Sequence, residues 1–477
     1  MRDHVVLFIN GQRHQLGYGD AAITLAEFLR ERLRLVGTKI VCNEGDCGAC
    51  SVLVGRRYST GRLEYRTVDA CITFLFQLDR THVVTVEGLS RSGELTPLQA
   101  AMVHCHGSQC GFCTPGMVLA MHGMIESKRE IDDTSLRYGL SGNLCRCTGY
   151  QQIFEAGKSV DCNAIETMNQ LYSDQSMIEQ FDSLGEHEVK IVGEKTIYLP
   201  HSVKQACQWK STHPTATVVS GATDLGVLYN HGRLAPNDVL CLTQIENFAE
   251  LSIDDHRLSI GGGATWTEIE PLVEKLFPPY HEIVTRFGSP QIRNSGTLAG
   301  NLATGSPIAD SIPFHLVMES DLHLVSVRGD RVVSLNDFYS GYRENVADED
   351  ELIAKIETPR LAANERLALY KVSKRRDMDI STLTFALRVR IDGDSIDRAW
   401  LAIGGAGPIV SRITPAEEYL AGSVLSLETF RRAGEIARDH ISPWSDVRGS
   451  KNYRQLLAEN LLLKAYHEFA GELSAVN

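Results

Sequence analysis

The distribution of cysteines constrains this chain more than any other feature of its sequence. Cys42, Cys47 and Cys50 lie in one short glycine-containing stretch, "CNEGDCGAC", and Cys71 follows further along the chain. Nine of the twelve cysteines precede residue 148, and none follows Cys241. Crowded thiols in a reducing compartment are more typical of metal ligands than of disulfides. One region of the chain is therefore expected to bind a metal that prefers sulfur.

The ends and the charge of the chain exclude several classes of protein. The N-terminus, "MRDHVVLFINGQRHQL", has no apolar segment of the kind found in secretion signals. No stretch approaches the roughly 18 uninterrupted apolar residues that a membrane helix needs. The net charge of −13 argues against binding to nucleic acid, which requires a basic face. We therefore expect a cytoplasmic protein that binds neither nucleic acid nor a membrane.

The first cysteine set has the spacing C-x4-C-x2-C, with a distant fourth cysteine, as in plant-type [2Fe–2S] proteins. Gly45, Gly48 and Ala49 allow the loop to wrap closely and to point backbone N–H groups at the sulfurs. The alternative is a structural zinc site, but zinc sites usually combine two C-x2–4-C pairs. The spacing therefore predicts a [2Fe–2S] centre.

A second cysteine set consists of one C-x2-C pair and one C-x-C pair, each shortly before a predicted helix. Its members are Cys110, Cys113, Cys145 and Cys147. Helix N-termini carry partial positive charge, which suits an anionic thiolate cluster. The spacing alone is equally compatible with zinc, but beside the first set it predicts a second [2Fe–2S] centre. The other four cysteines, Cys105, Cys162, Cys207 and Cys241, are assigned no role.

Local patterns predict the elements around these loops. Asn10-Gly11 after an apolar run indicates a β-hairpin, and Thr24 to Glu27 form a capping box. Further strands are expected at "CSVLVG", 63–68 and 82–86, which together suggest a small β-grasp domain. Thr96 and Thr114 are predicted N-caps, each followed by a proline at the first helical position, so a helical domain is expected next.

The remainder of the chain changes character twice. Residues 161–183 are polar and poorly periodic, as in a linker. From about residue 188 the pattern becomes α/β, and after about residue 363 alternating segments suggest a separate sheet followed by helices. A chain of 477 residues favours three or four domains.

The segments "CNEGDCGAC", "QCGFCTPGM" and "GNLCRCTGY", in that order, resemble the xanthine dehydrogenase family of molybdenum hydroxylases. The resemblance continues through "VVSGATDLG", "SGTLAGNLATGSPIAD" and "YKVSKRRDMDI". It implies a multidomain α+β fold with a flavin domain of the vanillyl-alcohol-oxidase type. The expected domains are a ferredoxin-type [2Fe–2S] domain at 1–86, a helical [2Fe–2S] domain at 87–160, a linker at 161–183, an FAD-binding domain at 184–362 and a C-terminal flavoprotein domain at 363–477.

By the same resemblance, two glycine-rich loops and several single residues bind FAD. The matching positions are Thr217, Val218, Val219, Ser220, Gly221, Ala222, Thr223, Asp224, Phe287, Thr297, Gly300, Asn301, Asp310, Ile353 and Lys371. The chemistry is compatible, because Gly221 and Ala222 let backbone N–H groups approach a pyrophosphate. The chain has neither G-x-G-x-x-G after a strand nor G-x4-G-K-[ST], so no Rossmann motif or P-loop is predicted.

The resemblance also implies a function. The chain would carry electrons from a molybdenum centre on a separate large subunit, through two [2Fe–2S] clusters, to FAD and then to NAD+. No side chain of this chain would be catalytic. In the family the second cluster lies nearer the molybdopterin, with Gln109 and Cys147 on that side. A heterotetramer of two small and two large subunits is expected by analogy.

Several alternatives stay open at this point. The partner subunit could oxidise xanthine or hypoxanthine in purine catabolism, or another N-heterocycle or an aldehyde. The chain could also be a self-contained NADH:acceptor diaphorase, or a zinc-stabilised interaction module without a redox role. The basic run Lys374, Arg375 and Arg376 either is a solvated loop or borders the flavin and helps to admit NAD.

Overall fold

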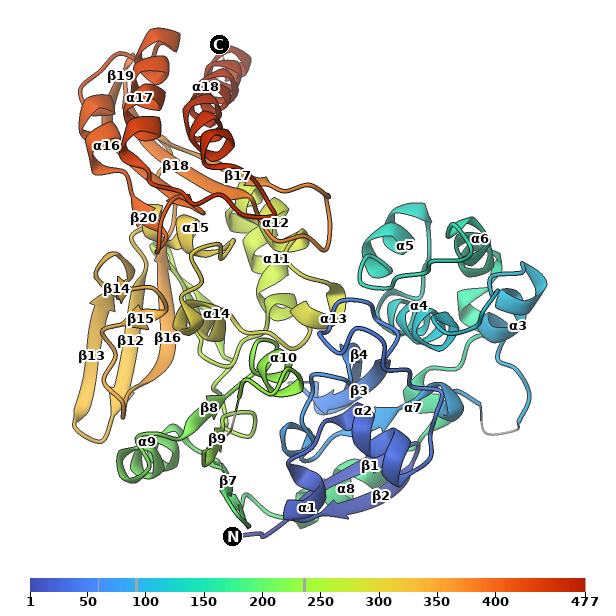
Figure 1. Ribbon diagram of the computed structural model, residues 1–477. Helices are drawn as coiled ribbons and strands as arrows, with labels where there is room; N and C mark the ends of the chain where they lie inside the picture. Colours follow the sequence, from blue (N-terminus) through green and yellow to red (C-terminus); the bar gives the residue numbers. More distant parts are fainter. Residues whose placement is uncertain (59, 91–92, 235–236, 477) are drawn as a thin grey trace. The chain divides into compact units, whose positions relative to one another are not determined.

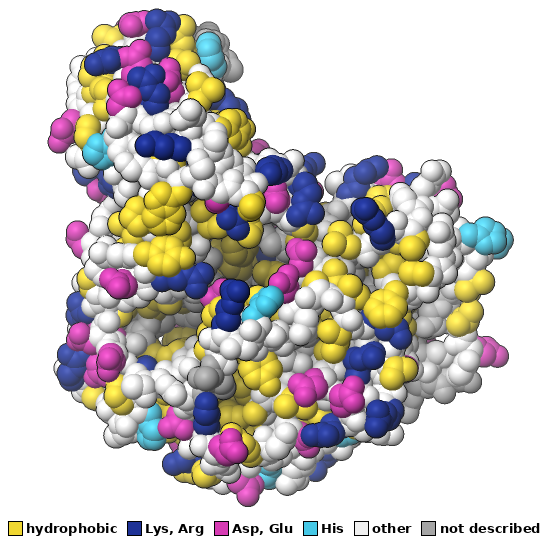
Figure 2. Space-filling model, in the orientation of Figure 1, with side chains coloured by type: hydrophobic (Ala, Val, Ile, Leu, Met, Phe, Trp, Pro, Cys, Tyr) yellow, Lys and Arg dark blue, Asp and Glu magenta, His cyan; other side chains and the backbone are white. Residues whose placement is uncertain are grey.

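The computed structural model describes residues 1–58, 60–90, 93–234 and 237–476, and the chain forms two compact units (Figure 1). The first unit comprises Met1–Glu246 and Gly288–Gly296, and the second comprises Asn247–Phe287 and Thr297–Asn477. In the described part of the chain, no helix is both long and apolar enough to cross a bilayer. On the face shown in Figure 2, basic side chains are interspersed with acidic ones.

The first unit begins with a five-stranded sheet in the order β2-β1-β5-β3-β4. Its strands are β1 (Val5–Ile9), β2 (Gln12–Leu16), β3 (Ser51–Arg57), β4 (Leu63–Asp69) and β5 (His82–Val84). The predicted hairpin is confirmed, because Ile9 pairs with Gln12 across Asn10 and Gly11, which both have positive φ. Short helical segments complete the domain: α1 (Tyr18–Ala21), α2 (Leu25–Glu27), η1 (Phe28–Arg32), η2 (Leu75–Leu78) and η3 (Val86–Gly88).

A helical region follows, with α3 (Pro97–His104), α4 (Thr114–Lys128), α5 (Asp133–Gly139) and α6 (Gln151–Ser159). Thr96 caps α3 as predicted, and its side chain accepts a hydrogen bond from the Gln99 N–H. The predicted start of α4 is wrong by one residue: the N-cap is Cys113, so Thr114 already lies inside the helix. The start of this helix is therefore a cysteine of the second set.

The segment 161–183, predicted as a linker, is largely helical. It contains η4 (Cys162–Ala164), α7 (Met168–Leu171) and α8 (Asp174–Ser183). Met168 and Phe181 are buried in the same hydrophobic cluster as the helical region. The Phe181 ring lies edge-on to Phe8 of β1, with 5.6 Å between ring centroids. Apolar side chains spaced along a polar segment thus pack it against the preceding domains.

The first unit ends in a small α/β layer with the strand order β6-β7-β9-β8. Its elements are β6 (Val189–Val192), β7 (Thr196–Leu199), α9 (Val203–Thr212), β8 (Thr217–Val219), α10 (Leu225–Asn230) and β9 (Val239–Cys241). Strands β7, β9 and β8 are parallel. The short helix α13 (Pro290–Arg293) returns to this unit from later in the sequence.

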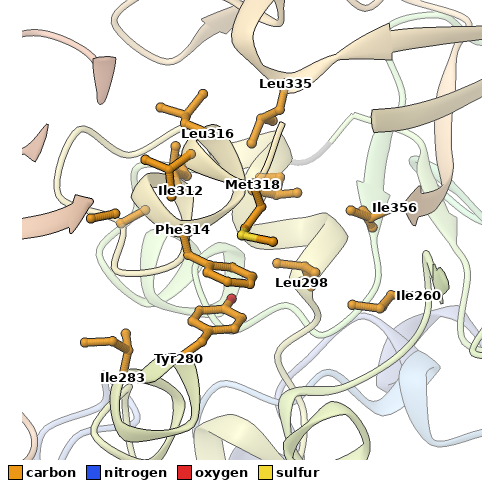
Figure 3. Packing of buried hydrophobic residues seen from close by; sticks show 14 of the residues in the cluster. Ile260, Tyr280, Ile283, Leu298, Ile312, Phe314, Leu316, Met318, Leu335 and Ile356 are labelled. Atoms are coloured by element: carbon orange, nitrogen blue, oxygen red, sulfur yellow. The ribbon is translucent and has the colours of Figure 1, made fainter. Parts of the chain in front are cut away.

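The second unit contains an antiparallel sheet in the order β10-β11-β16-β12-β13. The strands of this sheet are β10 (Leu251–Ile253), β11 (Arg257–Gly261), β12 (Asp321–Ser326), β13 (Gly329–Ser334) and β16 (Leu352–Pro359). The same region contains the helices α11 (Trp266–Leu276), α12 (Pro278–Thr285), α14 (Leu298–Thr304), α15 (Ile312–Val317) and η5 (Leu335–Asp337). Two short strands, β14 (Tyr339–Gly341) and β15 (Glu344–Asn345), pair with each other in a separate sheet. Figure 3 shows its core, in which Tyr280 and Phe314 stack with 3.8 Å between ring centroids, beside Met318 and Leu298.

A second sheet, in the order β17-β18-β19-β20, forms the C-terminal part of this unit. Its elements are β17 (Glu365–Val372), β18 (Leu383–Asp392), β19 (Ser395–Gly404), β20 (Ser411–Arg412), α16 (Thr414–Leu420), α17 (Leu427–His440) and α18 (Lys451–Val476). Buried residues of β17, β18, β19 and these three helices form one hydrophobic cluster, and Figure 1 labels the sheet and helices. The predicted separate sheet with C-terminal helices is confirmed, as is the multidomain α+β fold class.

Candidate functional site

The four cysteines of the first set converge at one end of the N-terminal sheet. Cys50 immediately precedes β3, and Cys71 follows β4. The thiol of Cys42 hydrogen-bonds with those of Cys47 and Cys71, and Cys71 also hydrogen-bonds with Cys50. Strand pairing explains this, because β3 and β4 are antiparallel neighbours whose register places Ser51 opposite Asp69. The sheet therefore brings Cys71 to a loop that lies far from it in the sequence.

The loop that carries Cys42 and Cys47 presents backbone donors to sulfur. The N–H groups of Glu44 and Asp46 each lie 3.4 Å from Sγ of Cys42. Gly45 and Gly48 have φ values of 70° and 63°, which non-glycine residues seldom adopt, so the predicted close wrapping of the loop is what the structure shows. Donors aimed at sulfur are what an anionic thiolate cluster requires from its surroundings.

The thiols of the first set differ in the direction in which their pKa values are shifted. Hydrogen bonds with Cys47 and then Cys71 lower the pKa of Cys42. The hydrogen bond with Cys42, followed by burial, raises the pKa of Cys47, and hydrogen bonds with Cys42 and Cys50 raise the pKa of Cys71. Each of these shifts thus arises from the close approach of the thiols to one another.

The second set converges at the N-terminus of α4. Cys113 occupies the N-cap position of this helix without a side-chain capping hydrogen bond. Its thiol hydrogen-bonds with that of Cys145, whereas Cys147 hydrogen-bonds with Cys110. Burial, with the Cys145 thiol next in importance, raises the pKa of Cys113 to about 12. Burial is the largest single influence on the pKa of Cys145 and raises it, but hydrogen bonds with Thr148 Oγ1, at 3.1 Å, with the backbone of Thr148 and Cys147 and with the Cys113 thiol together lower this pKa. Cys110 and Cys147 are exposed, while Cys145 is buried.

The two cysteine loops are joined directly. The N–H of Leu144, next to Cys145, donates to the backbone carbonyl of Cys47 over 2.9 Å. The buried side chain of Asn143 donates to the carbonyl of Gly48 over 3.0 Å. A Cβ atom at Gly116 of α4 would lie 2.2 Å from the same carbonyl, so this helix also touches the first loop. The two sets therefore belong to one continuous site within the first unit.

Within the described residues, no three or more His, Cys, Asp or Glu side chains surround a single-ion site. The thiols of the first set form one chain of contacts, from Cys47 through Cys42 and Cys71 to Cys50, whereas those of the second set form two pairs. Four converging thiols with N–H groups directed at sulfur fit the requirements of a [2Fe–2S] centre, whose two irons each take two thiolates. The ligand role of these eight cysteines stays a prediction.

The first predicted flavin loop, residues 217–224, spans β8 and the turn that leads into α10. Ala222 has a φ of 57°, and a Cβ atom at Gly221 would lie 2.1 Å from the carbonyl oxygen of Ser295. The loop is therefore packed tightly against the residues that precede Thr297. Gln77 of η2 donates to the Ser220 carbonyl over 2.8 Å, so the segment between β4 and β5 supports this loop.

The remaining predicted flavin residues lie in the second unit. Thr297 caps α14, and its Oγ1 accepts the N–H of Gly300 at 3.1 Å. Asp310 and Lys371 form a buried ion pair, with 2.6 Å between Oδ2 and Nζ. Phe287 lies beside Trp266, with 4.8 Å between ring centroids, and Phe287 and Ile353 pack against the same hydrophobic core.

Two serines that the sequence did not single out donate hydrogen bonds to the predicted flavin residues Asp310 and Asn301. Ser381 Oγ donates to the other carboxylate oxygen of Asp310, and Ser311 Oγ donates to Asn301 Oδ1, each over 2.5 Å. The Lys371 ammonium also donates to the carbonyl of Arg286 over 3.1 Å. Ser311 follows Asp310 directly, which is a local cue, but nothing in the sequence indicates Ser381.

The basic run Lys374, Arg375 and Arg376 lies in the loop between β17 and β18. Lys374 donates to the carbonyl of Val447 over 2.7 Å, and Arg375 donates to the carbonyl of Met378 over 2.6 Å. The Arg375 guanidinium also lies 3.7 Å from Asp379. Arg376 is exposed, and its carbonyl accepts a hydrogen bond from Nε of Arg286 over 3.3 Å. Of the three cations, Arg376 is thus the one whose side chain is best placed to meet a solute.

Three family models match the chain, in the order of its predicted domains. They are a [2Fe-2S] binding domain over residues 85–158, the FAD binding domain in molybdopterin dehydrogenase over 188–361, and the CO dehydrogenase flavoprotein C-terminal domain over 368–469. The first match includes helices α3 to α6, the second includes strands β6 to β16, and the third includes most of the sheet β17 to β20 with its helices.

Curated relatives that align over nearly the whole of this chain include xanthine dehydrogenases. The chain is 27% identical to xanthine dehydrogenase from Emericella nidulans over 533 residues, and 27% identical to xanthine dehydrogenase/oxidase from Gallus gallus over 549 residues. Each alignment covers 99% of this chain, but only 39% and 40% of the respective relative. The chain therefore spans less than half the length of these curated relatives.

Among solved structures, carbon monoxide dehydrogenase from Hydrogenophaga pseudoflava matches with a TM-score of 0.54 and 23% identity. Quinoline 2-oxidoreductase from Pseudomonas putida 86 matches with a TM-score of 0.53 and 24% identity. Each match covers 57% of this chain, and 95% and 94% of the respective structure, which establishes a shared fold. Three successive parts of the chain thus match, in this order, a [2Fe-2S] binding domain, the FAD binding domain in molybdopterin dehydrogenase and the CO dehydrogenase flavoprotein C-terminal domain.

Proposed function

We propose that this chain is the electron-transfer chain of a molybdenum hydroxylase. The observation that carries the proposal is that contacts within the first unit connect the two cysteine sets to the first predicted flavin loop. Two four-thiol sets are joined by the hydrogen bond from Leu144 to Cys47, and the first set adjoins the predicted flavin loop through Gln77 and α10. When bound, [2Fe–2S] centres carry single electrons and a flavin exchanges one or two, so together they connect a two-electron oxidation to a two-electron acceptor.

The residues of the chain bind and orient these groups. Cys42, Cys47, Cys50 and Cys71 would hold the first [2Fe–2S] centre, while Cys110, Cys113, Cys145 and Cys147 would hold the second. The N–H groups of Glu44 and Asp46 stabilise negative charge on Cys42. In the second unit, Ser381 and Lys371 fix both carboxylate oxygens of Asp310, so this carboxylate has a defined orientation.

For the whole enzyme we propose xanthine dehydrogenase, with a separate large molybdenum subunit, a heterotetrameric assembly and NAD+ as the acceptor. The curated relatives that align over nearly the whole chain bear the name xanthine dehydrogenase, which supports this choice. The second candidate is a hydroxylase for another N-heterocycle, such as the one named in the quinoline 2-oxidoreductase structure, which shares the fold.

Purification of the chain together with any large subunit it binds tests the proposal. We expect about four iron atoms, no stoichiometric zinc and one flavin per chain, as two [2Fe–2S] centres and one FAD require. Activity of the complex on a panel of purines, quinolines and aldehydes, with NAD+ or a dye as acceptor, then identifies the substrate class. Zinc in place of iron would contradict the proposed function, whereas reduction of the dye alone would contradict NAD+ as the acceptor.

A further inference from the structure

The last residue of α10, Asn230, contacts both loops of the first cysteine set. Its Nδ2 donates to the backbone carbonyl of Asn43 over 2.9 Å and to that of Cys71 over 2.8 Å. A side-chain amide has two N–H protons, and both are used here. Because both partners are carbonyl oxygens, which only accept, the amide nitrogen rather than its oxygen must face them.

The two carbonyls belong to loops that are far apart in the sequence. Asn43 follows Cys42 and has a φ of 59°, and Cys71 follows β4. One side chain therefore ties the first loop of the set to the position of its fourth cysteine. Hydrogen bonds between neighbouring thiols are weak and adjustable, whereas two amide hydrogen bonds of normal length constrain the backbones that carry the thiols.

The whole of α10 lies against this site. A Cβ atom at Gly226 would be 2.4 Å from the carbonyl oxygen of Ile72, so the helix approaches the turn after Cys71 closely. At its end, Nε2 of His231 lies 2.7 Å from Oε1 of Glu44, beside Asn43. At its start, the N–H of Gly226 bonds to the carbonyl of Ala222, in the predicted flavin loop, over 2.7 Å.

We propose that Asn230 is a positioning residue that holds the first [2Fe–2S] centre in a fixed relation to the first flavin loop. The inference rests on the proposed function, because it assumes that these cysteines bind a cluster. The helix transmits position from residues 222–224 to the loops at Cys42 and Cys71, since a short helix with both ends bonded moves as one body. Loss of the two hydrogen bonds frees the loops that set the environment of the sulfurs, and hence the reduction potential.

Two substitutions separate position from charge. Asn230→Asp keeps the size of the side chain but places acceptor oxygens and a negative charge against two carbonyls. Asn230→Ala removes both donors and adds no charge. Glu44→Gln is the matched control, because it removes a charge beside the same loop and leaves both carbonyl contacts of Asn230 intact. Asn336→Asp is a second control, an isosteric change on an exposed side chain in the second unit.

The measurements use the full chain in its complex, reduced with dithionite. Low-temperature EPR with redox titration should show a changed line shape and a shifted midpoint potential for the first centre in both Asn230 variants, while the second centre serves as the internal reference. Hydrogen exchange should be faster over residues 42–50 in Asn230→Ala than in the wild type and in Glu44→Gln, which is a readout independent of activity.

The outcomes distinguish the inference from the function on which it rests. A wild-type protein without two iron–sulfur signals would overturn both. Two wild-type signals with an unchanged first centre in both variants would overturn the positioning role alone, as would a shift confined to Asn230→Asp, because that result shows a charge effect only. If Asn230→Asp does not fold, Asn230→Ala decides the matter by the same two measurements.

Discussion

The side-chain amide of Gln291 donates a hydrogen bond of 2.8 Å to Oδ1 of Asn143, although 148 residues separate them in the sequence. Both side chains are almost completely buried, at 1% and 2% exposure. Gln291 also donates to Ser51 Oγ over 3.1 Å, and Ser51 in turn donates to the carbonyl of Gly48. Helix α13, the first cysteine loop and the second cysteine loop therefore meet in one buried polar network.

Removal of Gln291 should destabilise this network. In Gln291→Ala, the acceptor of Asn143 and the hydroxyl of Ser51 lose a buried donor, so we expect a loss of about 1–3 kcal/mol in the free energy of unfolding. A double-mutant cycle with Asn143→Ala should show strong coupling between the two positions. Gln175→Ala, which removes an exposed contact with Glu179, is the control and should change stability little. Additive effects of Gln291 and Asn143 would show that they do not act as a unit.

The buried ion pair of Asp310 and Lys371 should be costly to break on one side only. Asp310→Asn leaves a buried ammonium without its counter-charge, and breaking such pairs typically costs about 3–5 kcal/mol. Chemical denaturation measures this change, and the flavin content of the purified variant should fall with it. For comparison, the exposed pair of Glu428 and Arg431 should contribute less than about 1 kcal/mol. Equal effects at the two pairs would contradict the role of burial.

The two cysteine sets should be separable by single substitutions. Cys47→Ala should remove one of two distinguishable EPR signals and lower the iron content from about four to about two per chain. Cys113→Ala should remove the other signal. Cys207→Ala, at a buried cysteine outside both sets, should leave iron and both signals intact. Retention of both signals in Cys47→Ala would disprove the assignment of ligands.

Charge reversal in the basic loop tests the entry of NAD. Arg376→Glu should raise the KM for NAD+ several-fold and leave the reduction of an artificial dye unchanged, because the exposed guanidinium would meet the anionic dinucleotide. Arg375→Glu should do the same, but it also disturbs the contacts with Met378 and Asp379, so Arg376 gives the cleaner result. An equal loss of both activities would refute a role in NAD binding.

Acid should weaken the sheet of the second unit through Glu357. The hydrogen bond with Lys355, with further help from His323, lowers the pKa of Glu357 to about 2 from the model-compound value of 4.5. A carboxylate with a lowered folded-state pKa stabilises the protein above its unfolded pKa and loses that contribution as pH falls from about 4.5 toward 2. Between pH 6 and pH 3.5, the thermal midpoint of Glu357→Gln should therefore fall less than that of the wild type. Identical falls would exclude this linkage.

Local sequence patterns predicted much of this protein. The Asn10-Gly11 hairpin and the Thr96 cap are confirmed because each depends on a few adjacent residues and their backbone preferences. Prediction from local patterns failed where tertiary packing determines the local structure. The segment 161–183 looked like a linker because its few apolar residues show no clear period, yet Met168 and Phe181 find buried partners. The predicted domain boundaries and ligand sets stay predictions, although the thiols of each set lie together.

By itself, the sequence determined which side chains are available and how they are spaced: two groups of cysteines, glycine-containing loops and an order of elements typical of one family. Only the tertiary structure decided which distant residues support them. Asn230 faces Asn43 and Cys71, and Ser381 faces Asp310, because the packing of sheets and helices joins parts of the chain that have no local relation. A directed hydrogen bond depends on two backbones being placed together, and spacing within one segment carries no information about the other.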